Sequence, residues 1–140
     1  MGYESKIFIV ERYEFPKMET IPAHVSGAVV AEYDLCKMGG MDYNPEFYKA
    51  FKREIDYTLW LPTFDKDGNE VMGEVSEDCY GEHMKAATIP DLLSALKKCE
   101  KREHYRRLPP LIAMLEAFKK ELDEWENRDS VTLEVVHYGY

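Results

Sequence analysis

The feature that most constrains the fold of this 140-residue chain is a long apolar stripe near its C-terminus. From residue 108 to residue 125, apolar side chains recur at alternating spacings of three and four, and Pro109-Pro110 stands where a helix can begin. The stripe consists of Leu108, Leu111, Leu115, Phe118, Leu122 and Trp125, widened by Ile112 and Met114. Such a helix must bury its apolar face against another layer. We expect a sheet to supply that layer, because the run is too short for a typical coiled coil.

Strand patterns occur on both sides of this helix. Strands are predicted at residues 6–10, 28–36, 57–61, 71–75 and 131–138. The first is a continuous β-branched and aromatic run, which is typical of a buried strand. The second alternates apolar and acidic residues, with its apolar face formed by Val29, Ala31, Tyr33 and Leu35. A loop at residues 15–26 is predicted by Pro16 and Pro22, and a hairpin turn at residues 65–70 by Gly68 and Asn69.

Two further helices are predicted upstream of the C-terminal helix. Asn44-Pro45-Glu46 supplies a capping residue, a proline for the first turn and an acidic side chain for the positive end of the helix dipole. Thr88 predicts the cap of the second helix. The apolar stripes are Phe47, Phe51 and Ile55 in the first helix, of about three turns, and Leu92, Leu96 and Cys99 in the second.

The resulting order is strand, strand, helix, strand, strand, helix, helix, strand. Strands and helices mixed in this way, with a hairpin among them, predict an α+β fold. We expect a single domain over residues 1–140, with a largely antiparallel sheet of about five strands and two to three helices packed on one face.

Charge and cysteine content restrict the function classes. The net charge of −9 repels nucleic acid and anionic membranes, so direct DNA binding is not expected. Three widely spaced cysteines, Cys36, Cys79 and Cys99, predict no disulfide framework and favour a reducing cytoplasm. We expect no membrane span and no signal peptide. The chain has no phosphate loop, nucleophile motif or metal-spaced Cys/His cluster, which favours a non-enzymatic role without a cofactor.

The acidic segment at residues 65–82 is the first candidate binding site. Its acidic members, against the single Lys66, are Asp65, Asp67, Glu70, Glu74, Glu77, Asp78 and Glu82. The spacing from Thr63 onward is superficially that of a calcium loop. However, Thr63 would be the first ligand and Glu70 occupies a normally apolar position, which favours a hairpin turn. This face, with its flanking tyrosines, either is simply solvated or binds a protein that has a basic surface.

The basic cluster at residues 97–107 is the second candidate. It contains Lys97, Lys98 and Lys101, followed by the candidate ligand-binding residues Arg102, Tyr105, Arg106 and Arg107. Arginines beside a tyrosine can hold a phosphate and stack on a base, which suits a nucleotide-signal binding protein or sponge. The alternative is a helix C-terminus that complements its dipole and pairs with the acidic hairpin. The bipolar layout also permits head-to-tail homo-oligomers.

Cys79 and His83 form the third candidate. Residues four apart on a helix can share a metal ion, but two ligands do not make a site, and Gly81 argues against a helix here. Nothing nearby in the sequence suggests activation of the Cys79 thiolate. We therefore expect no metal site and no catalytic residue in this segment.

Four short segments of the chain resemble segments of known proteins: MGYESKI at residues 1–7, DLCK at 34–37, EDCYG at 77–81 and HYGY at 137–140. Together they resemble small acidic proteins encoded by bacteriophages and prophages, a group without established catalytic residues. The resemblance implies the cytoplasm of a bacterial host cell and a role in counter-defence. On this basis we expect an inhibitor that occupies the basic nucleic-acid-binding surface of an immune nuclease or CRISPR effector.

Overall fold

The structure is a computed structural model that describes residues 4–35, 45–99, 108–125 and 130–139. In order, the strands are β1 (Ser5–Phe15), β2 (His24–Asp34), β3 (Arg53–Glu54), β4 (Leu59–Phe64), β5 (Glu70–Val75), β6 (Lys85–Thr88) and β7 (Val131–Gly139). The helices are α1 (Pro45–Lys49), α2 (Ile89–Cys99) and α3 (Leu108–Glu124). The predicted α+β class is confirmed.

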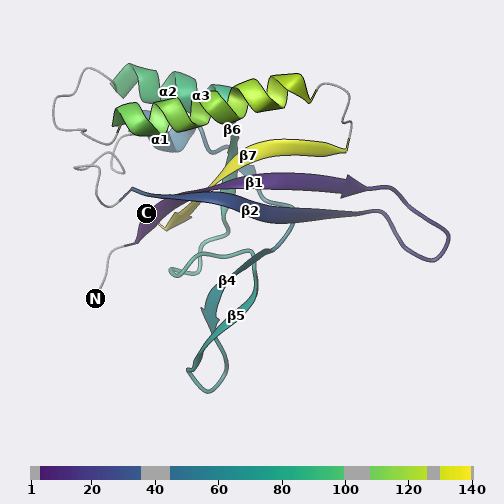
Figure 1. Ribbon diagram of the computed structural model, residues 1–140. Helices are drawn as coiled ribbons and strands as arrows, with labels where there is room; N and C mark the ends of the chain where they lie inside the picture. The colour runs from purple at the N-terminus through teal and green to yellow at the C-terminus, as the bar shows by residue number, and fades with distance from the viewer. Residues whose placement is uncertain (1–3, 36–44, 100–107, 126–129, 140) are drawn as a thin grey trace.

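The strands form two antiparallel sheets. The larger sheet has the order β2-β1-β7-β6-β3, and β4 and β5 pair only with each other. Figure 1 shows the helices covering one face of the larger sheet and the β4–β5 hairpin projecting from the other. The predicted sheet of about five strands with helices on one face is therefore confirmed.

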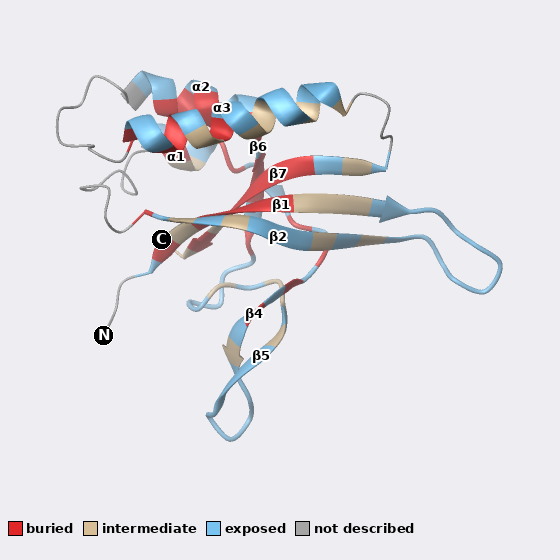
Figure 2. Ribbon diagram, viewed as in Figure 1, coloured by how far each residue is buried: buried red, intermediate tan, exposed pale blue. Residues whose placement is uncertain are grey.

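Two separate cores bury the central part of the larger sheet, one on each face. The first core lies under the helices and joins Ile7 and Ile9 of β1 to α2 and α3. The second core lies on the hairpin side and joins Phe8 and Val10 of β1 to β4 and β7. Successive side chains of a strand point to opposite faces, so an uninterrupted apolar run at residues 7–10 is what a central strand requires. Figure 2 shows this burial concentrated where β1 and β7 cross the middle of the molecule.

A β-bulge makes β2 change faces. Ile9 pairs with Ala31, but the next residue of β1, Val10, pairs with Val29, so Val30 is an extra residue. Ala31 therefore packs against the first core, whereas Val29 lies on the other face and is exposed. The predicted single apolar face of residues 28–36 is wrong at Val29. The strand also begins earlier, at residue 24.

The helix predicted from Asn44 is wrong in length. It ends at Lys49, where the Ala50 and Phe51 N–H groups donate hydrogen bonds to the carbonyl oxygens three residues earlier, those of Phe47 and Tyr48. The chain then enters β3, which pairs with β6. Phe51 consequently packs in the first core and Ile55 in the second, on opposite faces of the sheet.

The strand predictions need two corrections. The segments predicted at 57–61 and 71–75 form the separate β4–β5 hairpin and are not members of the larger sheet. Their places are taken by β3 and β6, which the sequence patterns did not indicate because each is short and polar at its ends. By contrast, the Thr88 cap is confirmed, since its hydroxyl accepts a hydrogen bond from the Asp91 N–H at 3.1 Å. The α3 stripe packs on the first core as expected.

Candidate protein-binding face

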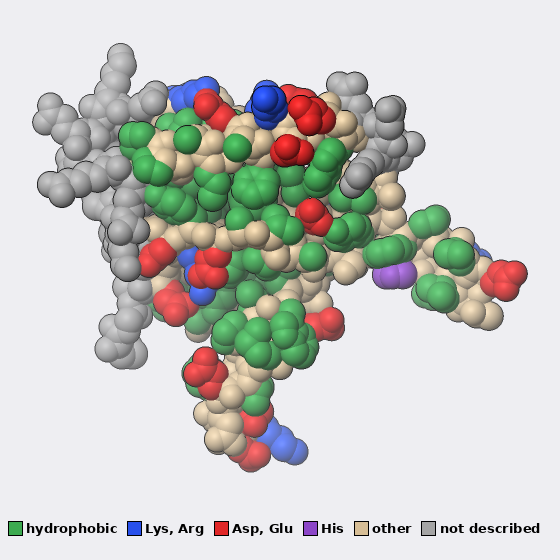
Figure 3. Space-filling model, viewed as in Figure 1, with side chains coloured by type: hydrophobic (Ala, Val, Ile, Leu, Met, Phe, Trp, Pro, Cys, Tyr) green, Lys and Arg blue, Asp and Glu red, His purple; other side chains and the backbone are tan. Residues whose placement is uncertain are grey.

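The outer face of the β4–β5 hairpin exposes large apolar side chains. Trp60 is 62% exposed, Phe64 71% and Met72 48%. Cross-strand pairing sets Trp60 opposite Glu74 and Phe64 opposite Glu70, so these side chains share one face. We call this surface the hairpin face; its members are Trp60, Pro62, Phe64, Glu70, Met72 and Glu74. Figure 3 shows apolar side chains gathered on the hairpin with acidic side chains around them.

The inner face anchors the hairpin to the rest of the fold. Leu59 and Leu61 are buried in the second core, and Val75 packs against it. Because the alternate residues Leu59 and Leu61 are buried in the core, Trp60 and Phe64 of the same strand point away from it. Single exposed apolar residues are common on protein surfaces, but several on one small face are typical of an interaction site.

Asp65, in the hairpin turn, holds the backbone in shape. Its Oδ1 accepts hydrogen bonds from the N–H groups of Asp67 and Asn69, both at 2.9 Å. Gly68 adopts a positive φ of 83° within the same turn. The carboxylate therefore has a structural role in the hairpin that the sequence predicted.

Asp78 builds a second turn of the same kind. Its Oδ1 accepts hydrogen bonds from the N–H groups of Tyr80 at 2.8 Å and Glu82 at 3.0 Å. Its Oδ2 accepts a further bond from the Gly139 N–H at 3.3 Å, which ties this turn to the end of β7. Of the seven acidic candidates, Asp65 and Asp78 thus stabilise turns by accepting backbone hydrogen bonds.

The other five acidic candidates, Asp67, Glu70, Glu74, Glu77 and Glu82, are exposed. Across the described part of the chain, none of the seven acidic candidates forms an ion pair. The hairpin and the turn after it therefore carry net negative charge, with Lys66 as the one cation of this segment and no described cation in an ion pair with these carboxylates. Apolar side chains surrounded by such charge have the anatomy of an interface with a basic protein.

The basic cluster does not neutralise this acidic segment as far as it is described. Lys97 pairs with Glu116 at 3.0 Å and Lys98 with Glu46 at 3.8 Å, both within the helix layer. This layer covers the face of the larger sheet opposite the hairpin (Figure 1). Pairing of these two lysines with the acidic hairpin is therefore ruled out. The candidates Arg102, Tyr105, Arg106 and Arg107 lie outside the described residues, and their ligand-binding role stays a prediction.

Cys79 and His83 show no sign of an activated thiolate. Partial burial raises the pKa of the Cys79 thiol, and the negative charges of Glu4 and Asp78 raise it further. The His83 Nε2 lies 3.0 Å from the carbonyl oxygen of Ile55. In the segments that the structure describes, no three His, Cys, Asp or Glu side chains are grouped so as to hold a metal ion.

A network of charged side chains beside the second core was not expected from the sequence. Glu134 of β7 is only 7% exposed; it pairs with Arg53 and accepts a hydrogen bond from the Tyr57 hydroxyl at 2.8 Å. Arg12 holds Asp56 through two bonds of 3.1 and 2.6 Å, which lower the pKa of that carboxyl. In the sequence, Glu134 stands between Leu133 and Val135, as a solvent-facing residue of a half-buried strand would. The sequence therefore did not indicate that Glu134 is buried.

Tyr57 is locked in this network by its neighbours. A side-chain carbon added at Gly27 would lie 2.4 Å from the Tyr57 ring, so the ring packs directly on the β2 backbone. Burial raises the pKa of the Tyr57 hydroxyl well above its ordinary value of 10.0, and the negative charge of Glu134 raises it further. The folded state therefore favours the protonated hydroxyl.

This preference predicts a loss of stability at alkaline pH. Above the ordinary tyrosine pKa of about 10, the unfolded chain releases the Tyr57 proton while the folded chain keeps it, so unfolding becomes easier as pH rises. Between about pH 9 and about pH 11, the fall in the free energy of unfolding should be about 1 kcal/mol smaller in Tyr57→Phe than in the wild type. Urea titrations at both pH values measure this difference. A wild-type slope in the variant would contradict it.

Comparison with known proteins supplies no relative for this chain. No family model, curated protein or solved structure matches it significantly. Among the described residues, no helix has the length and apolar composition needed to cross a membrane. The surface just described is therefore the basis for any functional proposal.

Proposed function

We propose that this chain is a non-enzymatic binding protein that docks its hairpin face on a protein with a basic surface. The observation that carries the proposal is the group of exposed apolar side chains, Trp60, Phe64 and Met72, among acidic residues that form no ion pair with any described residue. Buried aromatic side chains contribute most of the affinity in protein interfaces. The surrounding charge selects the partner and speeds the encounter.

The partner class follows from charge and from the resemblance to phage-encoded proteins. Basic grooves on bacterial proteins commonly serve to bind nucleic acid, and a surface with net negative charge can occupy such a groove. The proposed partner is therefore an immune nuclease or CRISPR effector of the bacterial host, inhibited in the host cytoplasm. A second copy of this chain is not the favoured partner for this face, because two acidic surfaces repel each other.

Affinity capture from a bacterial lysate tests the proposal. The wild-type chain should retain a basic nucleic-acid-handling protein at about 0.05 M salt and lose most of it at about 0.5 M salt. A double charge reversal, Glu74→Lys with Glu77→Lys, should slow association with that protein about tenfold or more. Asp65 and Asp78 are left intact, because they form turns.

The matched control carries the same change of charge on the helix layer. Glu121→Lys with Glu124→Lys alters two exposed acidic residues of α3, on the far face of the sheet from the hairpin. This control should associate at nearly the wild-type rate. Equal slowing by both double variants would mean that only net charge matters, and retention of no protein at all would contradict the proposed function.

A further inference from the structure

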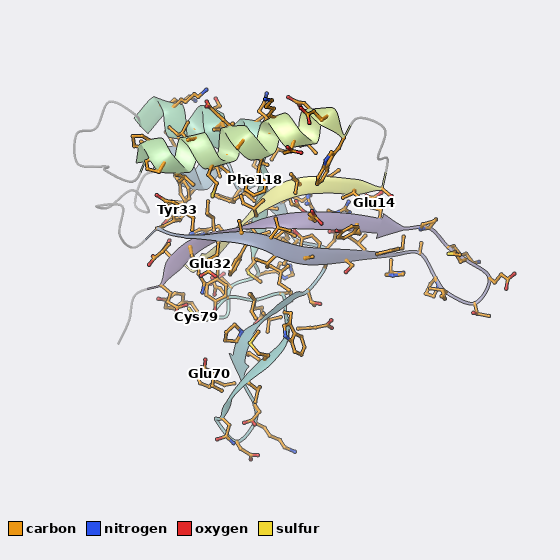
Figure 4. All side chains as sticks on the ribbon, viewed as in Figure 1. Glu14, Glu32, Tyr33, Glu70, Cys79 and Phe118 are labelled. Carbon is orange, nitrogen blue, oxygen red and sulfur yellow. The ribbon has the colours of Figure 1, made fainter. Side chains whose placement is uncertain are left out.

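A cleft of about 350 Å³ opens between the β4–β5 hairpin and the larger sheet. Its apolar walls come from Leu61, Pro62 and Phe64 on the hairpin and from Tyr138 on β7. Glu4 and Glu70 also line it, together with Lys6 and Cys79. In Figure 4, Cys79 lies between Glu70 of the hairpin and Glu32 of β2. The cleft is at the small end of ligand pockets, so it suits one long side chain better than a larger molecule.

The sheet side of the cleft already holds a cation on aromatic rings. The Lys6 Nζ lies 4.9 Å from the centre of the Tyr138 ring and 5.5 Å from that of Phe8. Its charge is matched by Glu32, at 3.5 Å, which is not among the residues that line the cleft. The cation on this wall is therefore already paired with a carboxylate outside the cleft.

Two carboxylates of the cleft have no cationic partner among the described residues. Neither Glu4 nor Glu70 takes part in an ion pair there. They come from different elements, the chain before β1 and the start of β5. Carboxylates from two elements at the same aromatic-lined cleft attract a second cation, and an apolar stem on that cation can pack on Leu61 and Phe64, which also line the cleft.

Arginine meets these requirements better than lysine. Its planar guanidinium can stack on an aromatic ring while its edges donate hydrogen bonds to more than one carboxylate. A lysine ammonium is a compact, strongly hydrated charge that gains less from such a cleft. Phe64 connects the cleft to the hairpin face, because it belongs to both surfaces.

We propose that this cleft receives an arginine side chain of the protein that docks on the hairpin face. The inference rests on the proposed function and adds a specific anchor to it: a projecting arginine from the partner's basic surface. The apolar stem would pack on Leu61 and Phe64, and the guanidinium would bind Glu4 and Glu70. The cleft would then account for selection of arginine-bearing partners over merely basic ones.

The test uses N-acetyl-arginine amide as the probe and follows the backbone amide signals of the whole protein by NMR. Saturable shifts should centre on Lys6, Phe64 and Cys79. N-acetyl-norleucine amide, which has a similar stem without charge, and N-acetyl-lysine amide should each bind at least about fivefold more weakly. Equal binding of the norleucine probe, or the absence of arginine-induced shifts at the cleft, would overturn the proposal.

Two variants separate the cleft from general charge. Glu70→Gln should weaken binding of the arginine probe about fivefold. Glu74→Gln removes the same charge from the same strand, but Glu74 does not line the cleft, so binding should change less than about twofold. Equal effects would overturn the assignment. Because this assay needs no cellular partner, it can fail while lysate capture succeeds, and the reverse, so the two proposals are tested separately.

Discussion

Replacing Glu134 with alanine is expected to lower the free energy of unfolding by about 3 kcal/mol. Glu134 is buried in β7, where it pairs with Arg53, accepts a hydrogen bond from Tyr57 and lies 4.0 Å from the Arg12 Nε. Removing the carboxylate leaves the Arg12 and Arg53 guanidinium groups with Asp56 as the one carboxylate that both still contact among the described residues. The loss should lie at the low end of the range for buried pairs, because Arg53 is about half exposed and water can solvate part of its charge.

Equilibrium unfolding in urea measures this effect. Thr132→Ala is the matched control, since Thr132 lies on the same face of β7 but is exposed, and its cost should be within about 0.5 kcal/mol. Glu134→Gln keeps an acceptor for the Tyr57 hydroxyl and should cost less than the alanine variant. A Glu134→Ala protein as stable as the Thr132→Ala protein would contradict the structural role assigned to the network.

The elements that were correctly predicted are those whose signals are local. β1 has four consecutive apolar residues because both of its faces are buried, and α3 has one stripe because only one of its faces is. The Thr88 cap depends on a residue only three positions away. Each of these patterns is complete within one segment, so the sequence alone is enough to identify it.

The elements that were missed depend on contacts between distant segments. β6 is a strand because Lys85–Thr88 pairs with residues 134–137 on β7, and β3 exists because β6 offers it an edge. The prediction that one helix includes Phe51 and Ile55 was wrong for a related reason. Phe51 packs in the first core and Ile55 in the second, on opposite faces of the sheet, so the two side chains do not share one helix face. Helical spacing is a weak guide where tertiary contacts override it.

The candidate site was predicted in its charge but not in its apolar part. The acidic residues of 65–82 are evident in the sequence, whereas Trp60 belonged to a segment expected to join the main sheet. One signal was present: Pro62 cannot donate a ladder hydrogen bond, which is typical of an edge strand. Alternation about Pro62 then assigns Leu59 and Leu61 to the core and Trp60 and Phe64 to the outside.

Replacing Trp60 with alanine should weaken binding to the captured partner by roughly 30-fold or more. A tryptophan that becomes buried on docking contributes both apolar area and close packing, and such residues dominate interface affinity. The free protein should hardly change, because the side chain is 62% exposed before binding. Its free energy of unfolding should stay within about 0.5 kcal/mol of the wild type. Titration calorimetry with the purified partner measures the affinity.

Met18→Ala supplies the comparison, because Met18 is a similarly exposed apolar residue on the separate β1–β2 hairpin. It should bind the partner as the wild type does. If both variants bind normally, the partner does not use the hairpin face. If both lose affinity, the interface extends over two hairpins. If only Trp60→Ala loses affinity, the partner binds the hairpin face. We expect the variant complex to dissociate faster while its association rate changes little. The apolar centre would then provide the affinity, and the acidic residues around it would set the association rate.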